Sequence, residues 1–281
     1  MGVSQHVHGT DNARCLIALA LTTGQIGRNG TGLHPLRGQN NVQGASDAGL
    51  IPMVFPDYQS VENQDIHSKY ENFWNVELDN KKGLTVVEVI NKILEDEIKS
   101  MYIMGENPAM SDPDQNHARK ALAKLDHLVV QDIFMTETAW HADVILPSSA
   151  HAEKTGTFTN TNRQVQLGRQ AVPPPGDARQ DWWITQAIAQ RMGLDWSYLH
   201  PRDVFNEMAQ VMPSMKNITY ERLEIEDSVT YPCDDPNKPG NEIIFNEKFP
   251  TANGRGKIVP ARLIPPAELP DDDFPMILTT G

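Results

Sequence analysis

Cysteine is scarce in this sequence, with only Cys15 and Cys233 among 281 residues. The two lie far apart and neither belongs to a CxxC pair, so they cannot by themselves form an iron–sulfur or structural zinc site. A disulfide scaffold is not expected either. So few cysteines are typical of a reducing compartment, and we expect a cytoplasmic protein.

Basic residues and long apolar runs are also lacking. Lys and Arg number 24 against 37 Asp and Glu, a formal charge of -13. Because phosphate neutralisation needs clustered cations, nucleic acid is not an expected partner. No stretch reaches the roughly 18 consecutive apolar residues of a membrane helix. The first residues lack a basic region followed by an apolar core, so neither membrane insertion nor a signal peptide is expected.

The clearest architectural signal is an alternation of strands and helices. Apolar runs at 101–104, 128–130 and 143–146 predict buried strands, separated by a helix at 113–125 and one or two helical turns at 135–142. This order predicts a parallel α/β unit with right-handed crossovers. In such sheets ligands bind outside the carboxyl ends of the strands. Polar segments follow the three predicted strands, at 105–107, 131–132 and 148–149.

Outside this unit the pattern predicts further helices, a hairpin and irregular segments. The expected helices are a buried one at 12–23, an amphipathic one at 85–97, one at 181–192 and one with Pro201 at its first position. The expected hairpin lies at 151–170, the irregular parts at 50–83 and 213–270, and a strand is expected to begin at 276–278.

The stretch LRGQNNVQGASDAG, residues 36–49, is rich in amides and glycines and nearly free of large apolar side chains. Such a composition is typical of a loop that holds a large polar ligand. Arg37 is its only cation, and a guanidinium matches a carboxylate or phosphate in a bidentate manner. A solvated surface loop explains the composition equally well. If a ligand is held, we expect this stretch to fold over the same rim as the strand ends.

Other polar residues have ordinary structural interpretations. Asp112 and Asp181 each suit a helix cap without any ligand. The nine histidines are scattered and lack HExxH spacing, so ordinary surface or core positions are the better interpretation for them.

Several runs together resemble one family. LRGQNNVQGASDAG, with MGVSQH before it and YIMGENP, VVQDIFMTETA, ADVILPSS and EKTGTFTNTNRQVQ after it, resembles the catalytic (alpha) subunit of molybdenum or tungsten formate dehydrogenases. These belong to the molybdopterin oxidoreductases. PGDARQDWW, MPSMKNITYERLE and TYPCDDPNKPGNEI are more similar to the cytoplasmic NAD-dependent branch. The family's iron–sulfur region, its Cys or selenocysteine metal ligand and its cap domain are not matched, so the resemblance implies an internal fragment, inactive as given.

The resemblance implies the fold, the chemistry and the partners. The fold would be α/β, with Rossmann-like parallel sheets and flanking helices. The intact enzyme would oxidise formate to CO2 at a bis-molybdopterin guanine dinucleotide centre with molybdenum or tungsten. Electrons would pass through iron–sulfur clusters to partner subunits with FMN and NAD. The expected domains are the end of one dinucleotide-binding domain (1–39), a second one (40–150), a β-rich segment (151–180), a helical and irregular segment (181–270) and the start of a truncated cap domain (271–281).

The resemblance also implies roles for individual residues. Arg37 would be the catalytic arginine that orients formate near the metal. The pterin contacts would be Met1, Gln5 and Gln39. The guanine dinucleotide contacts would be Asn107, Ser111, Gln131, Asp132, Thr136, Ser148 and Asp181. No metal ligand is expected in the chain. Two alternatives stay open: a non-catalytic dinucleotide-binding module, or another molybdopterin oxidoreductase, such as a nitrate reductase or the related large subunit of a quinone oxidoreductase.

Overall fold

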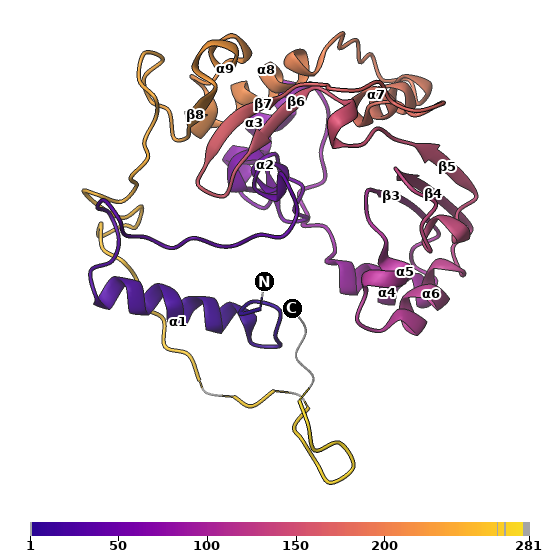
Figure 1. Ribbon diagram of the computed structural model, residues 1–281, viewed down its shortest axis with the longest axis horizontal. Helices are drawn as coiled ribbons and strands as arrows, with labels where there is room; N and C mark the ends of the chain where they lie inside the picture. Colours follow the sequence, from indigo (N-terminus) through magenta and orange to yellow (C-terminus); the bar gives the residue numbers. More distant parts are fainter. Residues whose placement is uncertain (1, 263, 267, 278–281) are drawn as a thin grey trace.

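A computed structural model describes residues 2–262, 264–266 and 268–277 of the chain. Two three-stranded sheets organise it, a parallel one at the right of Figure 1 and an antiparallel one along the top. Helix α1 (Gly9–Thr22) lies below both sheets, near the irregular C-terminal part of the chain. Among the helices of the described residues, none is long and apolar enough to span a membrane.

The parallel sheet confirms the predicted α/β unit, with strand order β3-β4-β5. Its register sets Met104 beside Gln131 and Asp132 beside Pro147, so the carboxyl ends of the strands lie at one edge. Leu128 and Val130 on the central strand are buried in its core. The elements are α4 (Val86–Leu94), β3 (Ser100–Met104), α5 (Pro108–Ser111), α6 (Gln115–Leu122), β4 (His127–Asp132), η2 (Ala139–His141) and β5 (Val144–Pro147).

Helix α4 confirms the amphipathic helix expected at 85–97. It begins with a capping box in which the Thr85 backbone N–H donates to Glu88 Oε2 at 2.7 Å. Ile90 and Ile93 point inward and pack against Ala121 of α6. The apolar stripe therefore holds α4 against α6.

The antiparallel sheet confirms the predicted hairpin and adds a strand from far along the chain. Its order is β6-β7-β8, and Val165 of β7 pairs with Val229 of β8. One apolar core joins this sheet to the helices beside it through Phe205, Met212 and Leu223. The elements are η3 (His151–Glu153), β6 (Gly156–Thr159), β7 (Gln164–Gly168), α7 (Asp181–Arg191), α8 (Pro201–Val211), η4 (Pro213–Met215), α9 (Tyr220–Glu226) and β8 (Ser228–Thr230).

Two segments that were expected to be irregular contain helices, α9 and α3 (Gln64–Trp74). Asn63 caps α3 by accepting hydrogen bonds from the backbone N–H groups of Asp65 and Ile66. Tyr70 anchors the helix in the core. The apolar residues of α3 lie at helical spacing, at Ile66, Tyr70, Phe73 and Trp74, so the sequence carries a helical signal here as well as the cap. The neighbouring short elements are α2 (Val42–Asp47), β1 (Val54–Phe55), η1 (Pro56–Tyr58) and β2 (Gln59–Ser60).

The expectation of a buried helix at 12–23 is wrong in one respect. The helix forms as α1, but Leu16, Ile17 and Leu19 on it are 45%, 40% and 59% exposed. Helical periodicity predicts which side chains share a face, but a partner must still cover that face. The strand expected at 276–278 is absent at residues 276–277, and its third position lies outside the described residues.

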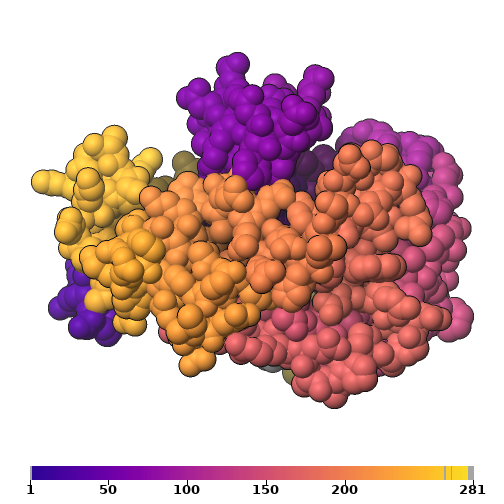
Figure 2. All heavy atoms as spheres, turned by 90° about the horizontal axis from the view of Figure 1, so that it is seen from above, coloured from indigo at the N-terminus to yellow at the C-terminus, as the bar shows by residue number. Residues whose placement is uncertain are grey.

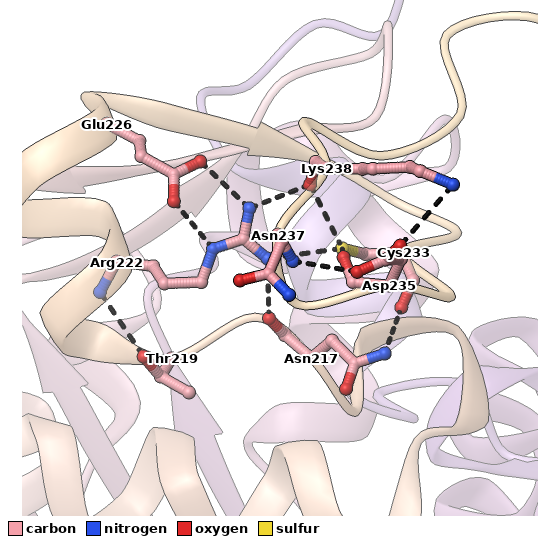
Figure 3. Close-up of polar contacts among 8 residues, drawn as sticks. All are labelled: Asn217, Thr219, Arg222, Glu226, Cys233, Asp235, Asn237 and Lys238. Atoms are coloured by element: carbon pink, nitrogen blue, oxygen red, sulfur yellow. Dashed lines mark hydrogen bonds and ion pairs between the residues drawn. The ribbon is translucent and has the colours of Figure 1, made fainter.

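A polar cluster around Arg222 ties α9 to the segment after β8 (Figure 3). The guanidinium forms a bidentate ion pair with Glu226, at 2.7 and 2.8 Å. It also donates to the backbone oxygens of Asn217 and Lys238, each at 2.8 Å, and to the buried Cys233 Sγ at 3.3 Å. These contacts hold the irregular segment after β8 against α9.

Candidate functional site

Arg37 lies at the wall of a largely apolar pocket of about 660 Å³. The pocket is formed by α1, the residues before it and the segment that leads into α2, including Leu16, Leu33 and Leu36. The guanidinium is half-buried, and its Nη1 donates to Ser46 Oγ at 2.9 Å. A cation in an apolar wall attracts an anion more strongly than the same cation in water.

A polar cluster with one buried carboxylate lies next to Arg37. Asp47, at the end of α2, is 2% exposed and accepts from Gln43 Nε2 at 2.8 Å. Burial raises the pKa of the Asp47 carboxyl above its usual value, while hydrogen bonds and the Arg37 charge oppose that rise. Gln43 Nε2 also lies 2.9 Å from the Tyr231 hydroxyl. The cluster therefore fixes α2, and with it Arg37, against the segment after β8.

The strand ends of the parallel sheet bring several predicted residues into one row. The backbone N–H of Gly105 donates to Gln131 O at 2.9 Å, and that of Ser148 donates to Asp132 O at 3.0 Å. The three polar segments are therefore direct neighbours. This is the edge at which ligands of parallel sheets bind.

Gln131 and Asp181 are joined in the middle of this row. Gln131 is completely buried, and its Nε2 donates to Asp181 Oδ1 at 2.7 Å. The Tyr102 hydroxyl donates to Gln131 Oε1. Lys154 Nζ pairs with Asp181 Oδ2 at 2.5 Å. A nucleotide base that formed a hydrogen bond with Asp181 would bind to a carboxylate that is already paired with Lys154.

The side chains of Asn107 and Thr136 both bond within the protein, to the segment that leads into η2. Asn107 Oδ1 accepts from the backbone N–H and the hydroxyl of Thr138, at 3.0 and 2.7 Å. Thr136 Oγ1 accepts from Ala139 N at 3.2 Å. Ser111 is exposed on the four-residue helix α5. Structural roles therefore account for the contacts seen at Asn107 and Thr136, and a ligand role for them stays a prediction.

Two features at this edge fit a nucleotide. Ser149 Oγ is buried and has no hydrogen-bond partner within the described part of the chain, so a donor or acceptor from a ligand would satisfy it. Gly105 has a φ of +64°, and a Cβ added there would meet nothing within 4 Å, which leaves open space over the turn. The amide, hydroxyl and carboxylate groups present match the hydrogen-bonding edges of a guanine base and a ribose.

Among the side-chain hydrogen bonds of the described residues, the amide-rich stretch reaches the segment just beyond β5 through Asn40, whose Nδ2 lies 3.3 Å from His151 Nδ1. Asn41 Oδ1 accepts from Thr159 N at 2.9 Å and fixes α2 on β6. Arg37 instead lines the pocket beside α1, because its guanidinium is tied to α2. The expectation that this stretch covers the strand-end rim is therefore met at Asn40 but not at Arg37.

Two of the three residues predicted to contact the pterin lie at or next to the pocket of Arg37. Gln39 lines the pocket with Arg37, and Gln5 follows the lining residues Gly2 to Ser4. Met1 lies outside the described residues. Lys154, Tyr102 and Thr138 join the strand-end row without having been predicted. The signal for Lys154 was a basic residue soon after the third strand, in the run EKTGT.

Over residues 2–262, 264–266 and 268–277, no group of three or more His, Cys, Asp or Glu side chains could hold a metal ion.

The first 191 residues match the family model described as Molybdopterin oxidoreductase. The chain belongs to the molybdopterin oxidoreductase family. That match spans α1, both candidate sites and α7, and so both sites are part of a molybdopterin oxidoreductase fold. The α/β fold class expected from the sequence is thereby confirmed.

Three similar proteins are named as subunits of formate dehydrogenases. F420-dependent formate dehydrogenase subunit alpha from Methanocaldococcus jannaschii is 53% identical over 283 residues, which cover 100% of this chain and 42% of that protein. The alpha subunits of F420-dependent formate dehydrogenases 2 and 1 from Methanococcus maripaludis are 46% and 45% identical, over 100% of this chain and 41% of each protein. The chain thus spans about two fifths of the length of these relatives. Their names give F420 rather than NAD, and so do not support the expected NAD-dependent type.

Proposed function

We propose that this chain is part of the alpha subunit of a formate dehydrogenase, and that the intact enzyme oxidises formate to CO2. The observation that carries the proposal is the 53% identity to such a subunit along the whole chain. The single cation of the amide-rich stretch, at the wall of an apolar pocket, supports it. A half-buried guanidinium there can bind a one-carbon carboxylate and orient it.

The electron acceptor that we propose is F420, in place of the NAD expected from the sequence. The similar alpha subunits from two methanogens carry F420 in their names. Iron–sulfur clusters, a flavin-bearing partner subunit and a cytoplasmic location stay in the proposal on the family resemblance alone.

Residues of this chain would hold the guanine dinucleotide ends and the pterin of the cofactor. Asn107, Ser111, Gln131, Asp132, Thr136, Ser148 and Asp181 would contact the guanine dinucleotides, and Met1, Gln5 and Gln39 the pterin. When bound, this group and its metal supply the two-electron redox chemistry. Arg37 would bind the substrate carboxylate, and Ser46 would hold the guanidinium through its 2.9 Å hydrogen bond.

The role of Arg37 is tested in the full-length subunit within its complex. Arg37→Lys keeps the charge but loses the planar fork, and Arg37→Ala loses both. We expect kcat/KM for formate to fall at least about 100-fold in Arg37→Ala, because a charge-assisted bidentate contact is lost at the reacting molecule. The measurement is formate-dependent reduction of F420, run in parallel with NAD.

The matched control is Arg14→Ala, which removes an exposed arginine of α1 whose Nη1 lies 3.1 Å from Asp11 Oδ1. Its kcat/KM should stay at the wild-type value. Unchanged turnover in Arg37→Ala would contradict the role of Arg37, and faster reduction of NAD than of F420 would contradict the proposed acceptor.

A further inference from the structure

A second groove lies away from both candidate sites, between the end of α3 and α8. Its volume is about 500 Å³. In Figure 2 the purple part of the chain, which includes α3, stands beside the orange part, which includes α8. The groove is lined chiefly by Phe73, Trp74, Trp196, Tyr198, Asp203 and Glu207, and these six residues are called the aromatic–acidic groove below.

The aromatic side chains of this groove are exposed to solvent on one side and fixed on the other. Phe73, Trp74 and Trp196 are 39%, 38% and 39% exposed. The inner side of Trp74 packs on the buried Tyr70 ring, with centroids 4.9 Å apart. Trp196 packs edge-on against Tyr198 at 6.2 Å. Ring faces held in this way can accept a partner without first being ordered.

The loop that carries Trp196 and Tyr198 is held on α7 by two glutamines. Gln186 Nε2 donates to Tyr198 O at 3.0 Å, and its Oε1 accepts from Tyr198 N at 2.6 Å. Gln190 Nε2 donates to Trp196 O at 2.5 Å. Because Gln186 is buried and uses both ends of its amide, the loop that carries the two rings is fixed on α7.

The charge of the groove is negative. Asp203 and Glu207 are the charged lining residues, and the lining set contains no basic side chain within the described part of the chain. The Tyr198 hydroxyl donates to Glu207 Oε2 at 2.5 Å, which holds that carboxylate beside the Tyr198 ring in the groove lining. Asp203 uses its Oδ2 to cap α8 through His200 N, at 3.0 Å. Glu207 is therefore the carboxylate best placed to meet a cation.

We propose that the aromatic–acidic groove binds the guanidinium of an arginine side chain that a partner protein presents. A guanidinium stacks flat on an indole face and forks onto a carboxylate, so it uses both kinds of group found here. Lysine and small quaternary ammonium ions can use the rings, but they lack the planar fork for Glu207. We infer an arginine because its positive charge is complementary to Asp203 and Glu207, and because its planar group can stack on the exposed, fixed rings.

The test uses the full-length subunit with 5-fluorotryptophan in place of tryptophan, observed by fluorine NMR. The probe is the blocked tripeptide acetyl-Gly-Arg-Gly-amide, and its neutral isostere carries citrulline in place of arginine. We expect the arginine peptide to shift the Trp74 and Trp196 signals and to leave that of Trp140, an exposed tryptophan of η2, unchanged. The citrulline peptide should bind at least about fivefold more weakly, the value of one lost cation–π contact.

Two variants complete the design. Glu207→Gln should weaken the arginine peptide by about fivefold, whereas Glu62→Gln, the same charge change at an exposed site, should have no effect. A third peptide, acetyl-Gly-Lys-Gly-amide, carries the charge without the planar fork. Equal shifts with the arginine and citrulline peptides, equal affinity in Glu207→Gln, or tighter binding of the lysine peptide than of the arginine peptide would each overturn the proposal. Absence of any shift at Trp74 and Trp196 would overturn it as well. None of these outcomes depends on formate oxidation.

Discussion

At the residue scale, the candidate substrate site rests on one half-buried positive charge and one buried negative charge. Arg37 reaches the pocket beside α1, while Asp47 lies next to it, 2% exposed. A buried carboxylate opposes folding through its lost hydration, and the nearby guanidinium returns only part of that loss. The cluster thus fixes the position of Arg37 at some cost to stability.

This arrangement predicts a pH dependence for Asp47. Because the folded state raises its pKa above 3.8, the folded state binds the proton more tightly than the unfolded state. The free energy of unfolding should therefore fall as the pH rises through the window between 3.8 and the folded-state pKa, and the destabilisation should be complete above it. In Asp47→Asn that fall should be absent. Urea unfolding of both proteins at several pH values measures the difference, and identical pH profiles would contradict the prediction.

Arg222 predicts a second effect at this scale. Its guanidinium serves Glu226, two backbone oxygens and Cys233 Sγ at once, which the three donors of a lysine cannot reproduce. Arg222→Lys should lower the free energy of unfolding by about 1 kcal/mol, because the bidentate pair with Glu226 and the bonds to backbone oxygens cannot all be kept. Arg202→Lys is the control, since Arg202 only approaches Asp203 at 3.9 Å. A loss of the same size in both variants would show that the fork of Arg222 is not what matters.

At the scale of elements, side-chain caps mark where two amphipathic helices begin. Thr85 starts α4 by a capping box, and Asn63 starts α3 by accepting from the backbone N–H groups of Asp65 and Ile66. Both caps satisfy backbone N–H groups that the first helical turn leaves free.

The cap of α4 gives an element-scale prediction. Thr85→Ala should lower the free energy of unfolding by about 1 kcal/mol, and Thr85→Ser should retain most of the stability. The Thr85 hydroxyl contacts Glu88 Oε2 at 2.8 Å, so serine can keep that contact. Hydrogen exchange of the α4 amides reports the change directly. Faster exchange in the serine variant than in the alanine variant would contradict the capping role.

At the scale of the whole molecule, the two candidate sites occupy different parts of the fold. The strand-end row belongs to the parallel sheet, whereas Arg37 belongs to α2 and the pocket beside α1. The only hydrogen bond described between the amide-rich stretch and the segment just after β5 is that of Asn40 with His151. A large cofactor that contacted both the strand-end row and the pocket of Arg37 would add contacts between these two regions.

The chain of 281 residues, produced alone, should therefore fail to oxidise formate. It contains two cysteines, of which Cys15 is on exposed α1 and Cys233 is buried beside Arg222, and the described residues contain no metal-binding cluster. Formate-dependent reduction of a redox dye measures this, with the full-length complex as the positive control. Turnover by the 281-residue chain would contradict the prediction.

The sequence by itself determined the local elements that have strong patterns. Continuous apolar runs gave the three parallel strands, alternation gave the β6-β7 hairpin, and Pro201 marked the start of α8, because these signals depend on neighbours in the chain. The polar segments at three strand ends were predicted to be neighbours for the same reason, and they are.

Which segments that are distant in sequence pack against each other depended on the tertiary structure. It placed β8 against β7, left the apolar stripe of α1 exposed, and paired Asp181 with Lys154. Periodicity shows that a side chain is apolar or where it points on its helix, but burial and ion pairing depend on which distant segment packs against it. For that reason the sequence could single out Arg37, and only the fold could show the pocket and the buried carboxylate beside it.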